Sequence, residues 1–116
     1  MSVKTLTPVK GEVNKITPFS FEAATAVADG FEFQIPRVAT EEYLVIMVQN
    51  AGNANATIAL KAPEKGSYAA ASSDESISLP AGAYAQIRIE SARYADTTGI
   101  VKLVGSSADV KVAVLC

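Results

Sequence analysis

The residues of this chain that can do acid–base or ligand chemistry are carboxylates and one thiol, because the sequence contains no histidine. Histidine is the commonest general base, the usual activator of serine and cysteine nucleophiles and the commonest metal ligand. Histidine-dependent catalysis is therefore excluded. A carboxylate pair of the glycosidase type remains, and the adjacent pairs Glu41–Glu42 and Asp74–Glu75 are its candidates.

Adjacent carboxylates are poorly placed for such chemistry, because neighbouring side chains of a strand point to opposite faces and those of a loop are usually solvated. Cys116 has no second cysteine as a partner, and its alternation with Val112 and Val114 indicates an inward apolar residue rather than a reactive or metal-binding thiol. No glycine-rich phosphate loop, calcium loop or nucleotide fingerprint is present. We predict no catalytic residue, no metal site, no cofactor and no enzymatic activity.

Two loop tyrosines, Tyr68 and Tyr94, are candidate binding residues. Tyrosine offers a rigid contact area with a polar tip, which suits stacking on a sugar or on a protein partner. A tyrosine in a loop can equally pin that loop to the body of the domain. The sequence leaves both interpretations open.

Composition predicts one domain that binds neither nucleic acid nor a membrane. The chain has 116 residues, and its 10 basic and 12 acidic residues are scattered, so no basic face is formed. No apolar run approaches the roughly 20 residues of a membrane span, and the N-terminus lacks the apolar stretch of a secretion signal. We expect synthesis in a cytoplasm. Only 19% of residues are charged, against about 25% in a typical domain, so either partners cover part of the surface or exposed alanine inflates the apolar fraction.

Strand patterns dominate from Phe31 onward. Alternation predicts strands with one buried face in several segments, and the uniformly apolar run Tyr43–Val48 predicts a central strand buried on both faces. The turn residues Gln49–Asn55 predict a hairpin leading into Ala56–Ala62. The residues that we expect in the core are Leu44, Ile46, Val48, Ile58, Leu60, Ile87, Ile89, Val112 and Val114.

Strands at roughly ten-residue spacing predict an all-β fold, an antiparallel sandwich or barrel that is immunoglobulin-like or jelly-roll-like. It comprises residues 19–116, although Phe19–Ala28 is compatible with a short helix as well as a strand. Residues 1–18 are predicted to be an extended arm, because Pro8 and Pro18 each remove a main-chain donor. The apolar residues of this arm are candidate contacts with a partner: Val3, Leu6, Val9, Val13 and Ile16.

The order of segments between Tyr43 and Leu115 resembles small virion proteins encoded near the capsid genes of tailed bacteriophages and prophages, which are similar to head decoration or cement proteins. The resemblance covers about two thirds of the chain and does not include its first 40 residues. It is a pattern of strands and turns rather than a catalytic signature. The segments that carry it are Leu44–Asn50, Ala56–Ala62, Ile77–Gly82, Ile89–Tyr94 and Val110–Leu115.

The resemblance implies a β-sandwich on the outside of a capsid that ties neighbouring capsomers together. Its expected partners are the major capsid protein and neighbouring copies of itself, and its expected location is the capsid surface of the virion. Two alternatives stay open. One is a receptor- or carbohydrate-binding module of a tail fibre or cell surface that uses Tyr68 and Tyr94, and the other is a self-assembling tail-tube or other virion component.

Overall fold

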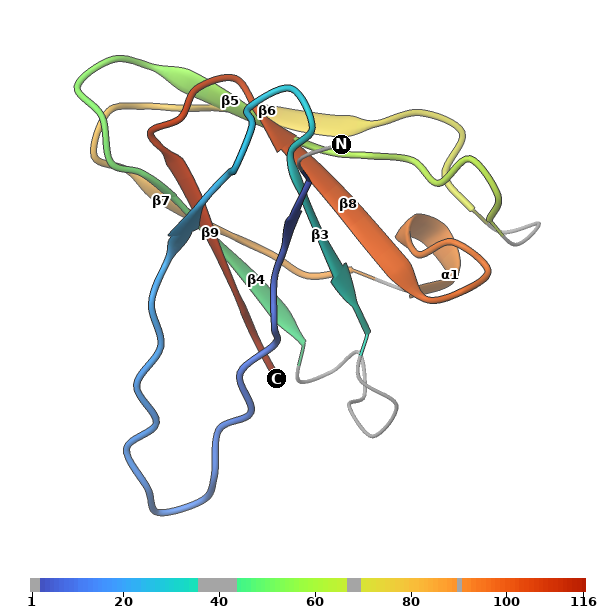
Figure 1. Ribbon diagram of the computed structural model, residues 1–116, viewed down its shortest axis with the longest axis horizontal. Helices are drawn as coiled ribbons and strands as arrows, with labels where there is room; N and C mark the ends of the chain where they lie inside the picture. Colours follow the sequence, from blue (N-terminus) through green and yellow to red (C-terminus); the bar gives the residue numbers. More distant parts are fainter. Residues whose placement is uncertain (1–2, 36–43, 67–69, 90) are drawn as a thin grey trace.

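The computed structural model of the chain describes residues 3–35, 44–66, 70–89 and 91–116. Within these ranges the chain is nearly all β, which confirms the expected class, and its strands form two sheets (Figure 1). The elements are β1 (Lys4–Thr5), β2 (Glu22–Ala23), β3 (Phe31–Gln34), β4 (Val45–Asn50), β5 (Ala56–Leu60), β6 (Glu75–Leu79), β7 (Tyr84–Ile87), α1 (Ser91–Tyr94), β8 (Ile100–Gly105) and β9 (Val110–Leu115).

The two sheets have the strand orders β1-β3-β8-β5-β6, called sheet A, and β2-β9-β4-β7, called sheet B. From β2 onward, the strands pair as the halves of one long folded hairpin: β2 with β9, β3 with β8, β4 with β7 and β5 with β6, all antiparallel. Pairs β4–β9 and β5–β8 complete the sheets. Every connection except that between β5 and β6 therefore crosses from one sheet to the other, which gives a sandwich-like fold.

Side chains that alternate along the strands fill the space between the two sheets. Phe33 on β3, Ile46 on β4 and Val112 on β9 each have 0% exposure. Ile87 differs from the prediction, because it is only half-buried although it packs against the core. The other predicted core residues are confirmed as buried: Leu44, Ile46, Val48, Ile58, Leu60, Ile89, Val112 and Val114.

Strand β4 is central in sheet B, as predicted, but it is not buried on both faces. Ile46 and Val48 are buried, whereas Val45 and Met47 are half-buried on the outer face. The difference arises because no second layer of strands lies over the outer face of sheet B in the described part of the chain. The outer apolar residues of β4 therefore belong to the surface.

The predicted hairpin at Gln49–Asn55 is wrong, because β4 lies in sheet B and β5 lies in sheet A. The turn instead carries the chain across the sandwich. Asn50 holds it there: its Nδ2 donates to the carbonyls of Ala54 (2.8 Å) and Leu79 (2.9 Å). Turn-forming residues mark a change of direction, but they do not determine whether the next strand pairs with the previous one.

The segment Phe19–Ala28, left open between helix and strand, contributes only the two residues of β2 as strand. The alanines that follow enter a turn, in which the carbonyl of Ala26 accepts hydrogen bonds from Asp29 N and Gly30 N, each 3.1 Å. Gly30 has a φ of 68°, a conformation that glycine adopts without the steric penalty of a Cβ atom. The segment therefore forms a short strand followed by a turn, and not a helix.

The predicted arm over residues 1–18 is not confirmed, because residues 3–11 lie along the body of the domain. β1 pairs in parallel with β3, and Val9 pairs in parallel with Leu115 at the end of β9. Leu6, between these two contacts, is 3% exposed and belongs to the core. Residues 12–20, called the projecting loop, extend away from the body (Figure 1).

Candidate interface

The projecting loop is anchored at both of its ends, to β9 and to Cys116 directly after it. Before it, Gly11 N donates to the carbonyl of Cys116 at 3.0 Å, and after it, Glu22 pairs with Val112. Near its tip, Lys15 Nζ lies 3.2 Å from Glu12 Oε2. The loop therefore has fixed ends and a turned tip, which presents its side chains away from the two sheets.

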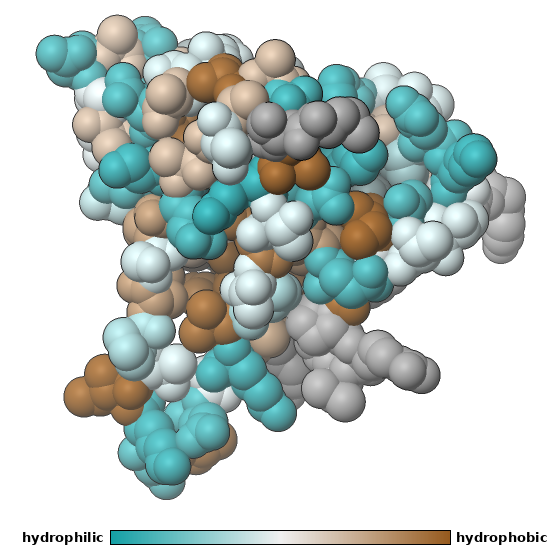
Figure 2. All heavy atoms as spheres, in the orientation of Figure 1, coloured by the Kyte–Doolittle hydropathy of each residue, from teal (hydrophilic) through white to brown (hydrophobic). Residues whose placement is uncertain are grey.

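The tip of the projecting loop exposes two aliphatic side chains. Val13 is 88% exposed and Ile16 is 99% exposed. Figure 2 shows hydrophobic residues on this projecting part, at the lower left of the view. Single exposed apolar residues are common on protein surfaces, but two on one projecting loop form a compact contact element. Burying each of them fully would contribute about 1.5–3 kcal/mol.

An aromatic cluster continues this apolar surface from the loop onto sheet B. The rings of Phe19 and Phe21 meet edge to face, with centroids 5.7 Å apart, and Phe21 lies 5.9 Å from the ring of Tyr84 on β7. Gln49 Nε2 donates to the hydroxyl of Tyr84 at 3.1 Å. Continuing the register of β2 and β9 by one residue places Phe21 opposite Ala113, which explains why this outward-facing alanine is only 5% exposed.

The outer face of sheet B is therefore more apolar than a solvated sheet face, although Gln49, Gln86 and Lys111 also lie on it. Together with the projecting loop, it forms what we call the apolar face. Its exposed rings are Phe19, 43% exposed, and Tyr84, 61% exposed. The half-buried or covered residues of the apolar face are Phe21, Val45, Met47, Ala113 and Leu115.

The structure brings together only some of the residues that the sequence predicted as contacts. Val13 and Ile16 lie on the apolar face, whereas Leu6 is in the core and Val3 and Val9 are half-buried along the body. A partner contact by Leu6 stays a prediction and would require residues 3–11 to leave their present position. Tyr94 is half-buried against the core, and Tyr68 lies outside the described residues.

Sequence reasoning missed Phe19, Phe21 and Tyr84 as contact residues. The alternation of Phe19 with Phe21 was a usable signal, since it indicates two rings on one side of a strand. The alternation of Tyr84 and Gln86 with apolar residues of the same segment predicts an outward position for Tyr84. This position is confirmed, and the ring of Tyr84 meets that of Phe21, which comes from a distant part of the chain, while its hydroxyl accepts from Gln49.

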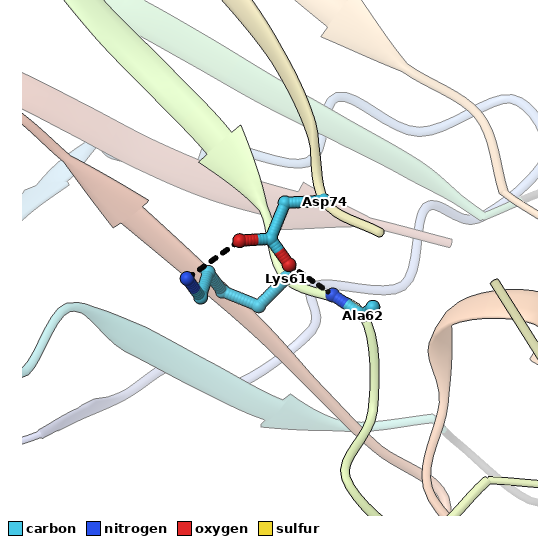
Figure 3. Close-up of polar contacts among 3 residues, drawn as sticks. All are labelled: Lys61, Ala62 and Asp74. Carbon is cyan, nitrogen blue, oxygen red and sulfur yellow. Dashed lines mark hydrogen bonds and ion pairs between the residues drawn. The ribbon is translucent and has the colours of Figure 1, made fainter. Parts of the chain in front are cut away.

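Asp74, one of the candidate catalytic carboxylates, connects two segments of sheet A (Figure 3). Its Oδ2 accepts a hydrogen bond from Lys61 Nζ at 2.6 Å, and its Oδ1 accepts one from Ala62 N at 2.8 Å. The bond from Lys61, followed by that from Ala62, holds the pKa of Asp74 below its ordinary value of 3.8. This geometry joins the end of β5 to the segment before β6. Glu41 and Glu42 lie outside the described residues.

Asp96 organises the turn before β8 in a similar way. Its Oδ1 accepts hydrogen bonds from Thr98 Oγ1 at 2.6 Å, Thr98 N at 2.8 Å and Ile100 N at 3.0 Å. The side-chain bond from Thr98 is the largest cause that lowers the pKa of Asp96 below 3.8. Both aspartates are thus held ionised by structural hydrogen bonds.

These two lowered pKa values predict a loss of stability in acid. A carboxyl whose pKa is lower in the folded chain stabilises the fold above the unfolded value of 3.8 and loses this contribution as pH falls through the folded value. We expect Asp74→Asn/Asp96→Asn to be less stable than the wild type at neutral pH and to lose less stability on acidification. Urea titrations from neutral pH to about pH 2 measure this, with Glu64→Gln/Asp109→Asn as the control. Parallel acid profiles for wild type and Asp74→Asn/Asp96→Asn would contradict the assignment.

A cleft of ≈ 240 Å³ with charged and apolar lining residues lies beside this part of sheet A. It is lined by residues of both charges, including Lys61, Asp96 and Lys102, with Tyr94 as its aromatic side chain. Across the described ranges, no group of three or more His, Cys, Asp or Glu residues is arranged to hold a metal ion. No helix in these ranges is long and apolar enough to cross a membrane.

Comparison of the chain with models of known protein families, with curated proteins and with solved structures found no match.

Proposed function

We propose that this chain is a structural protein of a tailed-phage virion, a decoration or cement protein that binds the outside of the capsid and bridges capsomers. The observation that carries the proposal is the apolar face, where the projecting loop with Val13 and Ile16 stands beside the exposed rings of Phe19 and Tyr84. Such a face suits binding to another protein. The resemblance of Tyr43–Leu115 to phage virion proteins supplies the identity of the partner, the major capsid protein.

We also propose that the sandwich is of the jelly-roll type. Its support is the nested pairing of β2 with β9, β3 with β8, β4 with β7 and β5 with β6, because a jelly roll is a long hairpin rolled into two four-stranded sheets. An immunoglobulin-like sandwich would divide its strands ABED and CFG instead. Jelly rolls occur in viral capsid proteins and in lectins, which favours a virion role only by analogy.

The proposed mechanism is stabilisation by many weak contacts. A protein that binds the assembled lattice but not free capsid subunits stabilises the lattice by mass action. Each copy needs only a modest affinity, since bridging contacts on one surface act together. Burial of the two aliphatic side chains of the projecting loop would supply a large part of the affinity of each copy.

Charges on the projecting loop test this proposal. We expect Val13→Asp/Ile16→Asp to weaken capsid binding at least about tenfold, because it removes apolar burial and forces two carboxylates into the contact. The fold should be retained, since both residues are almost fully exposed. Binding is measured by sedimentation of the protein with capsids over a range of protein concentrations.

A matched control adds the same charge elsewhere. Asn53→Asp/Ala81→Asp introduces two carboxylates at exposed positions in other turns, and it should bind capsids like the wild type. Equal affinities of Val13→Asp/Ile16→Asp and this control would remove the projecting loop from the interface.

A carbohydrate-binding module is the second candidate, and the cleft lined by Tyr94 and charged residues favours it. Sugars are bound by stacking on an aromatic ring beside polar side chains, and Lys61, Asp96 and Lys102 line this cleft. Binding to a glycan array that is lost in Tyr94→Ala would support this candidate over capsid decoration. Rings or tubes formed by the isolated chain would instead support the tail-tube alternative.

A further inference from the structure

The N-terminal strap, defined as residues 3–11, is bound almost entirely to the body of the domain. Leu6 inserts into the core, and Lys4 Nζ lies 3.6 Å from Glu22 Oε1. The main-chain hydrogen bonds of the N-terminal strap include Lys4 N to Gly30 O (3.0 Å), Leu6 N to Glu32 O (2.8 Å), Val9 N to Val114 O (2.9 Å), Cys116 N to Val9 O (2.9 Å) and Gly11 N to Cys116 O (3.0 Å).

The projecting loop ties the strap to the rest of the chain only loosely. Among the described residues 12–20, the structure shows one main-chain hydrogen bond between two loop residues. It runs from Lys15 N to Glu12 O at 3.3 Å. A hollow of ≈ 310 Å³ separates the strap near Leu6 and Val9 from the returning chain near Pro18 and Phe19. The contacts that hold the strap are therefore independent of the path of the loop.

We propose that the N-terminal strap is exchanged between copies of this chain. The strap of one copy lies against β3 and β9 of a second copy and makes there the same hydrogen bonds and the same Leu6 contact that it makes within one chain. No strap contact is lost in the exchange, because donor and acceptor groups are identical in the two copies. The partner of this surface is thus a second copy of the chain.

The projecting loop has the length and composition of a connection between molecules. Its nine residues, 12–20, span about 30 Å when extended, which exceeds the shortest dimension of the molecule, 24 Å. Val13 and Ile16 are exposed when the loop turns back on its own domain. In the exchanged form, the extended loop runs from one body to the next.

Concentration decides between the two forms. Within one chain, the short loop gives the strap a high effective concentration, and exchange also loses translational and rotational freedom. Exchange therefore requires many copies held close together. A surface that collects copies, such as the capsid lattice of the proposed function, supplies this condition, but a concentrated solution does so without any capsid.

The single cysteine of the chain provides a direct test. Val9 is the pairing partner of Leu115, and Gly11 N donates to Cys116 O, so residue 10 lies beside Cys116. In Lys10→Cys, mild oxidation joins residue 10 to Cys116. The disulfide closes a ring within one chain when the strap is not exchanged, and it produces a covalent dimer or larger species when it is.

The experiment equilibrates purified Lys10→Cys at a series of concentrations, oxidises it and separates the products by non-reducing electrophoresis. We expect the ratio of covalent dimer to ring-closed monomer to rise about tenfold for each tenfold rise in concentration while dimers are the minority. Two control variants measure the disulfides that form by random collision. They are Lys10→Cys/Cys116→Ala, and Ala54→Cys, which retains Cys116. Ring-closed monomer at every concentration, or dimers no more abundant than in these controls, would overturn the proposal. The isolated protein is used, so the outcome is independent of capsid binding.

Discussion

Ile46→Ala is expected to lower the free energy of unfolding by about 2–5 kcal/mol, as truncations of buried aliphatic residues do. Ile46 has 0% exposure and lies in the centre of sheet B, paired with Val114 on one side and Ile87 on the other. Removing its side chain leaves a cavity between the sheets that neighbouring strands cannot fill, because main-chain hydrogen bonds hold them on both sides. Urea or guanidinium unfolding measures the change.

Ile87→Ala is the matched comparison, because the same side chain is removed from the adjacent position of the neighbouring strand. Ile87 is half-buried on the edge strand β7, so water can occupy the space that its side chain leaves. We expect Ile87→Ala to cost about 1–2 kcal/mol, which is less than Ile46→Ala costs. Equal costs for the two variants would contradict the partial burial of Ile87 on this edge strand.

Asn50→Ala is expected to cost about 2–4 kcal/mol, because it leaves several buried polar groups without partners. Asn50 has 0% exposure. Its Nδ2 donates to the carbonyls of Ala54 and Leu79, and its Oδ1 accepts from Gly52 N at 3.0 Å. One side chain thus joins the turn after β4 to the end of β6, so its loss loosens the two connections that cross the sandwich there.

Asn53→Ala is the control for this prediction, since Asn53 lies in the same turn and is exposed. A surface substitution of this kind is expected to change stability by less than about 0.5 kcal/mol. Unfolding free energies of the two variants in the same denaturant series give the comparison. Similar values for both would mean that the hydrogen bonds of Asn50 are replaced by water.

The strands and most of the core could be predicted from the sequence because these features depend on local periodicity. Phe31 and Phe33 alternate with polar residues, and both are buried. The same holds for Ile58 and Leu60. A side-chain period of two directly determines which residues face the same side of a strand.

The pairing of strands could not be predicted in this way, because it depends on contacts between distant segments. The turn Gln49–Asn55 has the composition of a hairpin turn, yet Asn50 uses its side chain to bond Leu79, 29 residues away. The position of the N-terminal segment was missed for the same reason. Its prolines indicated an extended chain, but only the tertiary structure shows that Leu6 fills part of the core.

The candidate interface was predicted in part. Val13 and Ile16 were expected as contacts because they are apolar residues in a polar segment, and the structure shows both exposed. The aromatic part of the apolar face forms only when Phe21, before β2, meets Tyr84, on β7. Residues more than sixty positions apart in the sequence carry no local signal of such a contact.

Sedimentation of the purified wild-type chain with capsids of the phage or prophage that encodes it tests the central proposal most directly. Capsid decoration predicts saturable co-sedimentation at a fixed number of copies per capsid, with no binding to unassembled capsid protein. The bound capsids should also withstand higher temperature before they open, because only the assembled lattice is bound. A chain that stays in the supernatant at every concentration would contradict the account.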